Sequence, residues 1–166
     1  MSPVVGDVEF RTGLGWDVHR IAPGRPLIIG GVTIPSEFGL DGHSDADILL
    51  HAVTDALLGA AALGDIGMHF PDTDPQWKGA ASARFLEHAV ALLSQNGFTL
   101  VNVDTTVILE KPKLKNYREA IRESLARALA LPVDRVSVKF KTAEGVGPVG
   151  LGLSAEAQAI ATITKG

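Results

Sequence analysis

The residues with the clearest chemical potential are one aspartate and two histidines. Asp17 and His19 are two positions apart in a segment, residues 10–19, whose alternation predicts a strand, so both side chains should lie on one face. His51, on a predicted helix, is the best candidate for a third ligand. Two imidazoles and a carboxylate suit zinc with an open fourth position, the pattern of a catalytic zinc site. Without His51, a hydrogen-bonded pair at a strand edge explains Asp17 and His19 equally well.

A second polar group precedes an Ala- and Leu-rich helix that is expected over residues 45–63. Ser44 is predicted to cap this helix, with Asp47 completing a capping box. Because helix N-termini attract anions, His43 and Ser44 are expected to hold a phosphate beside the metal. The alternative is plain capping by Ser44 with a solvated His43, and the nearby metal candidates favour the functional interpretation.

The same helix carries a polar stripe on an otherwise apolar surface. Asp47, His51 and Asp55 follow each other at intervals of four residues, which places them on one face. A mostly buried helix needs a reason to keep such a stripe, and metal or substrate binding supplies one.

Carboxylates in loops provide weaker candidates. Asp65 and Asp72 lie in Gly- and Pro-rich segments, where such residues usually solvate a turn, although they could bind sugar hydroxyls or a second cation. Thr142 and Glu144 follow a predicted strand, and they could donate to a phosphate and bind Mg²⁺.

The remaining elements predict an α/β (α+β) sandwich with helices on one face of a sheet. Strands are expected over residues 27–29, 98–109, 136–142 and 154–164, and helices from near Ser82 to Gly97 and over residues 115–130. A Gly/Pro/Ser-rich loop is expected between residue 31 and Ser44. Residues 1–9 are expected to form a short N-terminal extension, and residues 10–166 a single domain.

Composition excludes several classes of protein. The 166 residues carry a net charge of -4 and contain no cysteine. An acidic chain is a poor candidate for nucleic-acid binding, and the missing thiols exclude disulfides and thiolate catalysis. We see no membrane span and no leader peptide, and we expect a cytoplasmic protein.

Taken together, these motifs resemble the family of 2-C-methyl-D-erythritol 2,4-cyclodiphosphate synthases. The similarity runs from about Arg11 to the C-terminus and is carried by residues 15–20, 29–31, 42–47, 51–52, 55–60, 63–67, 70–74, 111–113 and 141–144. The resemblance implies a ferredoxin-like fold with a mixed sheet, and a homotrimer, packed through the sheet faces, with active sites between subunits. It also implies that a CDP-linked sugar-alcohol phosphate closes to a cyclic diphosphate with release of CMP.

The resemblance also assigns roles to individual residues. Asp17, His19 and His51 match the zinc ligands, Glu144 matches a ligand of magnesium or manganese, and His43 and Thr142 match residues that stabilise the transition state. The substrate contacts implied are Ser44, Asp65, Ile66, Gly67, Phe70, Pro71, Asp72, Thr73, Asp74, Leu109, Glu110, Lys111, Pro112, Lys113, Leu114, Lys115, Lys141 and Ala143.

Three positions depart from the family pattern. Leu151 and Leu153 stand where many members have Arg and Glu, of which the Arg faces the centre of the trimer, and Lys141 stands where Thr is common. Two other functions stay open on the residues alone: a non-catalytic diphosphate-binding protein and a zinc phosphohydrolase.

Overall fold

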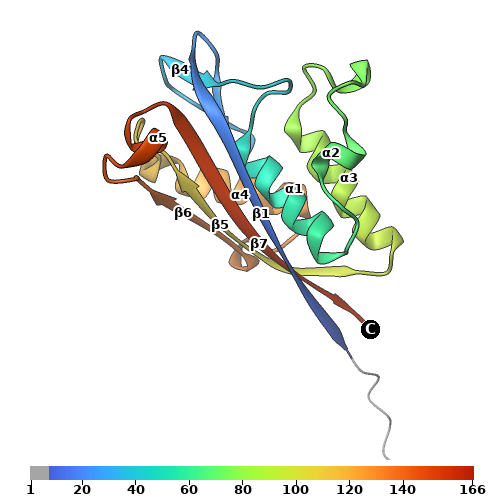
Figure 1. The fold of residues 1–166 in the computed structure, drawn as a ribbon. Helices are drawn as coiled ribbons and strands as arrows, with labels where there is room; N and C mark the ends of the chain where they lie inside the picture. Colours follow the sequence, from blue (N-terminus) through green and yellow to red (C-terminus); the bar gives the residue numbers. More distant parts are fainter. Residues whose placement is uncertain (1–7) are drawn as a thin grey trace, which may run out of the picture.

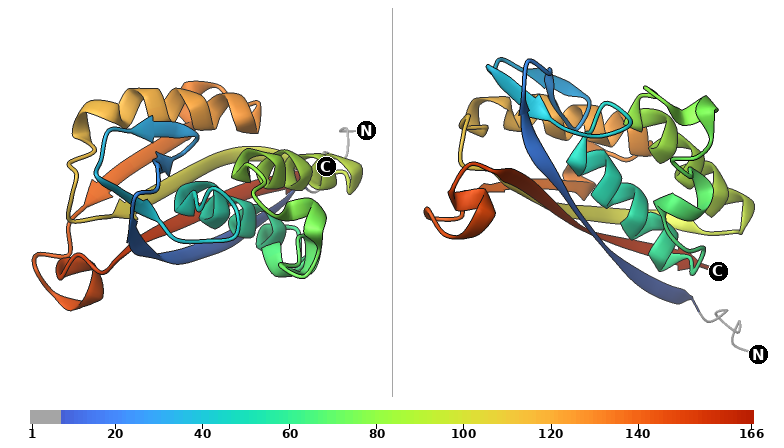
Figure 2. Two further views of the ribbon diagram at one scale, coloured as in Figure 1. Left: turned by 90° about the horizontal axis from the view of Figure 1, so that it is seen from above. Right: turned by 45° about the horizontal axis from the view of Figure 1, so that its top comes forward.

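The computed structural model describes residues 8–166. Most of the expected N-terminal extension, residues 1–7, lies outside the described residues, and Glu9 already belongs to the first strand. Figure 1 shows a sheet with the main helices packed on one side of it, and the views in Figure 2 confirm this two-layer arrangement. The expected fold class, helices on one face of a mixed sheet, is therefore confirmed.

Within residues 8–166, the main sheet has five strands in the order β4-β1-β7-β5-β6, of which only β5 and β6 pair in parallel, and β2 and β3 form a separate antiparallel pair. The strands are β1 Glu9–Pro23, β2 Leu27–Ile29, β3 Val32–Ile34, β4 Phe38–Leu40, β5 Thr99–Ile108, β6 Val136–Lys141 and β7 Ser154–Lys165. The helices are α1 Ile48–Ala60, α2 Ile66–His69, α3 Ser82–Gln95, α4 Arg118–Leu129 and α5 Gly147–Gly150, with 3-10 turns at Pro75–Trp77, Lys115–Tyr117 and Val133–Arg135.

The longest pairing joins β1 and β7 in antiparallel register. The alternation expected for the last strand is confirmed, because its four alanines at positions 155, 157, 159 and 161 are at most 1% exposed. They face the helices, and the residues between them face the other side of the sheet. Small inward side chains on β7 leave room for α1 to lie close against the sheet.

Helix α1 lies so close to β1 that two strand positions cannot carry a side chain. A Cβ atom on Gly15 would come within 1.8 Å of the carbonyl oxygen of Ala52, and one on Gly13 within 2.0 Å of that of Ala56. Asp17 and His19 continue the same inward face of the strand. Two glycines therefore set the distance between α1 and the expected metal ligands.

The first helix begins later than expected. Its N-cap is Asp47 rather than Ser44, because Ala46 adopts a positive φ of 57° that interrupts helical geometry. The Asp47 carboxylate accepts N–H bonds from Leu50, Gly30 and Gly31, which ties the helix start to the β2–β3 turn. Asp47 consequently does not belong to the polar stripe, which reduces to His51 and Asp55.

The remaining predicted helices and strands are confirmed in part. The stop at Gly97, with φ of 78°, and the helix from Ser82 are confirmed. The expected helix over residues 115–130 begins as a 3-10 turn and becomes α-helical only at Arg118. The loop expected before Ser44 contains β3 and β4, and the short helices α2 and α5 were not expected.

The sheet face turned away from the helices is apolar near its centre. Leu14, Trp16 and Ile160 lie on adjacent strands β1 and β7 and are 68%, 51% and 46% exposed. Contiguous apolar surface on one face of a sheet is typical of an interaction site. Among residues 8–166, no helix combines the length and apolar composition that crossing a membrane requires.

The contact between α1 and β1 generates the first prediction. Gly15→Ala should lower the free energy of unfolding by at least about 2 kcal/mol, because the new methyl group meets helix backbone rather than a movable side chain. Gly59→Ala is the matched control, because Gly59 lies on α1 and a Cβ atom there would meet no atom within 4 Å. This control should raise stability by about 0.5–1 kcal/mol. Urea denaturation measures both; equal behaviour of the two variants would contradict the proposed packing constraint.

Candidate metal and substrate site

The three predicted zinc ligands meet at one point between β1 and α1. His19 Nε2 and His51 Nδ1 lie 2.9 and 3.0 Å from the same oxygen, Asp17 Oδ2, and 3.3 Å from each other. These are the only three His or carboxylate groups in residues 8–166 that cluster tightly enough to hold a metal ion. The strand spacing and the helix position that predicted the cluster are thus confirmed.

The donor set and its spacing fit a divalent metal. Ligands about 2.0–2.1 Å from a tetrahedral centre lie roughly 3.3 Å apart, close to the distances observed here. The second nitrogen of each imidazole is also engaged: His19 Nδ1 meets the Asp41 carbonyl oxygen, and His51 Nε2 lies 2.7 Å from Ser82 Oγ. Such outer contacts are characteristic of histidines that bind metals. The residues present therefore suit zinc or a similar cation with a position left for substrate.

The electrostatics of the cluster favour a cation. Burial raises the pKa of Asp17, but hydrogen bonds from His19 and His51 outweigh it and lower this pKa to about 2. Burial lowers the pKa of His19, but the hydrogen bond and the charge of Asp17 outweigh it and raise this pKa. Asp17 therefore keeps a full negative charge throughout the physiological pH range.

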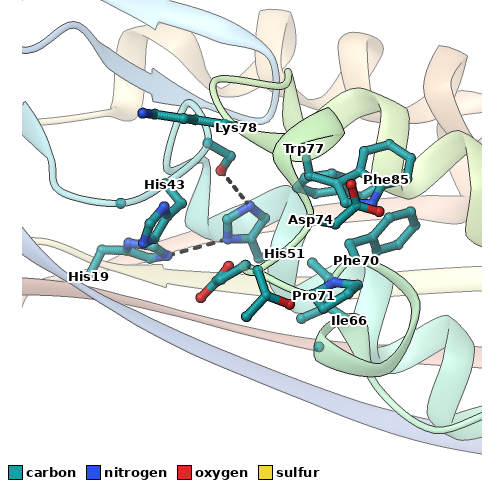
Figure 3. A pocket seen from close by; sticks show the side chains of 15 residues that line it. His19, His43, His51, Ile66, Phe70, Pro71, Asp74, Trp77, Lys78 and Phe85 are labelled. Carbon is teal, nitrogen blue, oxygen red and sulfur yellow. Dashed lines mark hydrogen bonds between the residues drawn. The ribbon is translucent and has the colours of Figure 1, made fainter.

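A cavity of about 450 Å³ opens beside His19 and His51 (Figure 3). One wall is aromatic: the ring centroids of Phe70 and Phe85 lie 4.5 Å apart, and Trp77 packs edge-on against Phe70 at 4.9 Å. These rings form a small separate core that supports the loop from Phe70 to Trp77. The predicted substrate-loop residues Phe70, Pro71, Asp72, Thr73 and Asp74 all line the cavity, together with Ile66 and Gly67.

His43 and Ser44 also line the cavity, but not as the start of a helix. His43 is exposed, whereas Ser44 is 9% exposed and turns its hydroxyl toward His51 Nε2 at 3.2 Å. The Ser44 hydroxyl also accepts the N–H bond of Ala46. The expected anion site at a helix N-terminus is therefore wrong in its structural basis, and any phosphate contact of His43 comes from its place on the rim.

The loop that carries His43 is clamped by Arg25. Its guanidinium donates to the carbonyl oxygens of Gly42 and Ser44 at 3.0 and 3.1 Å and to the Asp41 carboxylate at 3.2 Å. The Asp41 carbonyl in turn contacts the imidazole of His19. One arginine therefore positions both the rim histidine and the outer partner of a predicted metal ligand.

Two aspartates shape the turn after α1. Asp65 caps α2 by accepting the N–H bond of Met68 at 3.0 Å, and Asp55 accepts that of Ile66 at 2.8 Å. Burial raises the pKa of Asp55, and the neighbouring Asp65 adds to this effect. The carboxylates of Asp55 and Asp65 thus fix the backbone of the segment that was predicted to bind substrate hydroxyls.

The other predicted residues form a second group at the ends of β5 and β6. The Leu109 N–H donates to the Lys141 carbonyl oxygen at 2.9 Å, and the Ala143 N–H donates to Glu110 Oε1 at 2.6 Å. Thr142 and Glu144 contact each other at 3.3 Å. The group comprises Leu109, Glu110, Lys111, Pro112, Lys113, Leu114, Lys115, Lys141, Thr142, Ala143 and Glu144. In the described part of the chain, none of these residues lines the cavity beside His51.

Sequence reasoning missed several residues of the site. Lys78 lines the cavity and brings a positive charge to its rim, Arg25 holds the rim loop, and Ser82 contacts His51. The sequence predicted Ser82 at the start of a helix, but it did not indicate the contact with His51, which lies 31 residues away. Lys78 lies four residues after Asp74, and this nearness to the predicted substrate loop was the available hint that it belongs to the site.

Comparisons with known proteins identify the family of the chain. Residues 10–164 match the YgbB family. A protein of Solibacter usitatus named 2-C-methyl-D-erythritol 2,4-cyclodiphosphate synthase is 71% identical over 157 residues, which are 95% of this chain and 99% of that protein. The chain belongs to the YgbB family.

Solved structures share the fold as well as the sequence. The bifunctional IspDF of Campylobacter jejuni has a TM-score of 0.92 and 39% identity, and it covers 96% of this chain, which spans 43% of that longer protein. A CDP complex of IspF from Plasmodium falciparum has a TM-score of 0.83 and 33% identity over 94% of this chain and 96% of that one.

The clamp on the rim loop generates the second prediction. Arg25→Met keeps the aliphatic stem but removes the donors to Gly42 and Ser44, so backbone amides of residues 41–44 should exchange hydrogen faster. Co²⁺ affinity should fall about tenfold through His19, in the range typical of outer contacts. Arg127→Met, exposed on α4, is the control and should change neither. Unchanged exchange and affinity in Arg25→Met would show that the clamp does not position the loop.

Proposed function

We propose that the chain converts 4-diphosphocytidyl-2-C-methyl-D-erythritol 2-phosphate to 2-C-methyl-D-erythritol 2,4-cyclodiphosphate with release of CMP, in the non-mevalonate route to isoprenoid precursors. The observation that carries this function is the cluster of Asp17, His19 and His51 at the edge of an open cavity. Membership of the YgbB family and the names of its relatives support the same reaction. The CDP complex of a structural neighbour supports a cytidine nucleotide as part of the substrate.

The reaction is an intramolecular phosphoryl transfer. An oxygen of the 2-phosphate attacks the β-phosphorus, and the bond from that phosphorus to the oxygen of the α-phosphate breaks, so CMP leaves with the bonding electrons. The nucleophile is already ionised near neutral pH, and no protein nucleophile is needed. The protein must instead hold mutually repelling phosphates in line.

The cavity residues can meet this demand. Lys78 and His43 are placed on the rim, where they can contact phosphate oxygens, while the aromatic wall excludes water from one side. Asp65 and the backbone around Gly67 are candidates for binding the hydroxyls of the substrate. These contacts orient the chain of phosphates before the reaction.

We propose zinc at Asp17, His19 and His51, and magnesium or manganese at Glu144. When bound, the two ions supply positive charge to the diphosphate and make its phosphorus more electrophilic. The chain has a net charge of -4, so bound metal ions would supply positive charge that the protein as a whole lacks to a substrate that carries several negative charges.

We further propose a homotrimer of ferredoxin-like subunits with each site shared between neighbours. The zinc cluster and the group around Glu144 are separate within one chain, so a complete site requires the second group of another copy. The apolar outer face formed by Leu14, Trp16 and Ile160 supports the same assembly, because association would remove it from water. A cytoplasmic location stays a prediction.

The third prediction tests the activity. With Zn²⁺ and Mg²⁺, ³¹P NMR should show paired cyclic-diphosphate resonances that grow together with CMP. Asp17→Asn and His51→Ala should reduce turnover by at least about a thousandfold while the protein stays folded, because each removes a ligand of the ion that aligns the phosphates. A chelator should abolish activity, and added metal should restore it.

Other outcomes would identify the alternative functions. Binding of the substrate without CMP release would indicate a non-catalytic diphosphate-binding protein. Inorganic phosphate with linear products would indicate a phosphohydrolase. Full activity of Asp17→Asn would show that the zinc assignment is wrong.

The fourth prediction tests the assembly. Trp16→Glu places a charge on the apolar outer face and should convert the trimer to a monomer in sedimentation experiments. Activity should be lost although the zinc cluster of each chain is unchanged. Glu123→Lys, exposed on α4, controls for altered charge and should stay trimeric and active. A stable, active wild-type monomer would refute the shared site.

A further inference from the structure

His51 Nε2, the ring nitrogen that faces away from Asp17, contacts Ser82 and, through it, Asp45. The proposed reaction assigns neither residue a role. His51 Nε2 lies 2.7 Å from Ser82 Oγ, and Ser82 is fully buried at the start of α3. The Ser82 hydroxyl in turn contacts Asp45 Oδ1, and the Ser82 N–H donates to Asp45 Oδ2 at 3.1 Å. The Asp45 carboxylate also accepts the N–H bond of Asp47 at 3.2 Å.

The direction of these hydrogen bonds follows from the donors available. The Ser82 hydroxyl donates its proton to Asp45 Oδ1. The Ser82 oxygen is then free to accept, and the nearest donor is His51 Nε2–H. With the ring proton on Nε2, the lone pair of Nδ1 points toward Asp17 and His19, so a metal bound there would replace the hydrogen bond between Nδ1 and Asp17. Ser44 Oγ lies farther from the imidazole, at 3.2 Å, and is a weaker partner.

Neighbouring hydrogen bonds join the segment of His43 and Asp45 to the residues that follow the substrate loop. The Gly79 N–H donates to the His43 carbonyl oxygen at 3.0 Å, and the Asp45 N–H donates to that of Ala80 at 3.3 Å. Asp45 and Ser82 complete this junction with two further hydrogen bonds. The loop that lines the cavity is therefore fastened, at its C-terminal end, to the partner of a metal ligand.

We propose that Ser82 and Asp45 are positioning residues that fix the ring orientation and protonated nitrogen of His51, so that Nδ1 is presented to the metal. This inference rests on the proposed metal site but not on the proposed substrate. Both residues act through His51 and touch neither metal nor substrate.

Metal affinity provides the test. Ser82→Ala should bind Co²⁺ 10–100-fold more weakly than wild type, the range usual for partners of metal-bound histidines. Asp45→Asn should weaken binding less, because its amide oxygen can still accept some of the hydrogen bonds. The double variant should be no weaker than Ser82→Ala, since residues acting through one chain of hydrogen bonds are not additive. Ser94→Ala, exposed on the same helix, is the control and should match wild type.

A second measurement uses the unaltered protein. In the Zn²⁺-loaded wild type, NMR should show a proton on His51 Nε2 that exchanges slowly with water, and Ser82→Ala should lose it. An unprotected proton in the wild type, or unchanged Co²⁺ affinity in folded Ser82→Ala, would overturn the inference. Wild type that binds Co²⁺ and shows these effects but releases no CMP would refute only the proposed reaction.

Discussion

The site depends on the direct contact of helix α1 with strand β1. At Gly13 and Gly15 no side chain separates them, and a single methyl group would collide with the carbonyl oxygens of Ala56 or Ala52. Because the backbone of the helix packs directly on the backbone of the strand, the helix has little freedom to slide or rotate. Protein interiors are close-packed, so even one added methylene group disturbs them. His51 precedes Ala52 and is thereby held over Asp17, the next inward position of the strand. The glycines thus determine a distance that the ligands themselves could not enforce.

The ligand cluster brings three donor atoms to one point. Three atoms with lone pairs lie within 3.3 Å of one another, and Asp17, with a pKa of about 2, stays charged. A proton on His19 also interacts favourably with this charge, because the hydrogen bond and the charge of Asp17 raise the pKa of His19 despite its burial. A divalent ion could bind all three lone pairs at once, so the geometry of the cluster favours a cation.

Periodicity predicted the long elements because burial on one face leaves a regular pattern. The alternating alanines of β7 and the stop at Gly97 are examples. Strands β3 and β4, of three residues each, are too short to show a period, whereas the equally short β2 was predicted because its apolar run ends at Gly30 and Gly31. Ser44, Asp45 and Asp47 are all good helix caps, and only the positive φ of Ala46 decides among them. Contacts such as those of Ser82 or Arg25 join residues distant in sequence, and no local pattern reports them.

Strand β1 serves two surfaces through the alternation of its side chains. Gly15, Asp17 and His19 face α1, whereas Leu14 and Trp16 face away from the helices. In the proposed trimer, the outward residues would pack against other copies, so a shift that improves the subunit contact also moves the metal ligands on the opposite face. Mutations of the outward residues would then alter catalysis without touching the site. The close α1–β1 contact limits that shift, so the metal ligands of a single chain keep their places when assembly is lost, and what is lost is the second group of residues that a complete site requires.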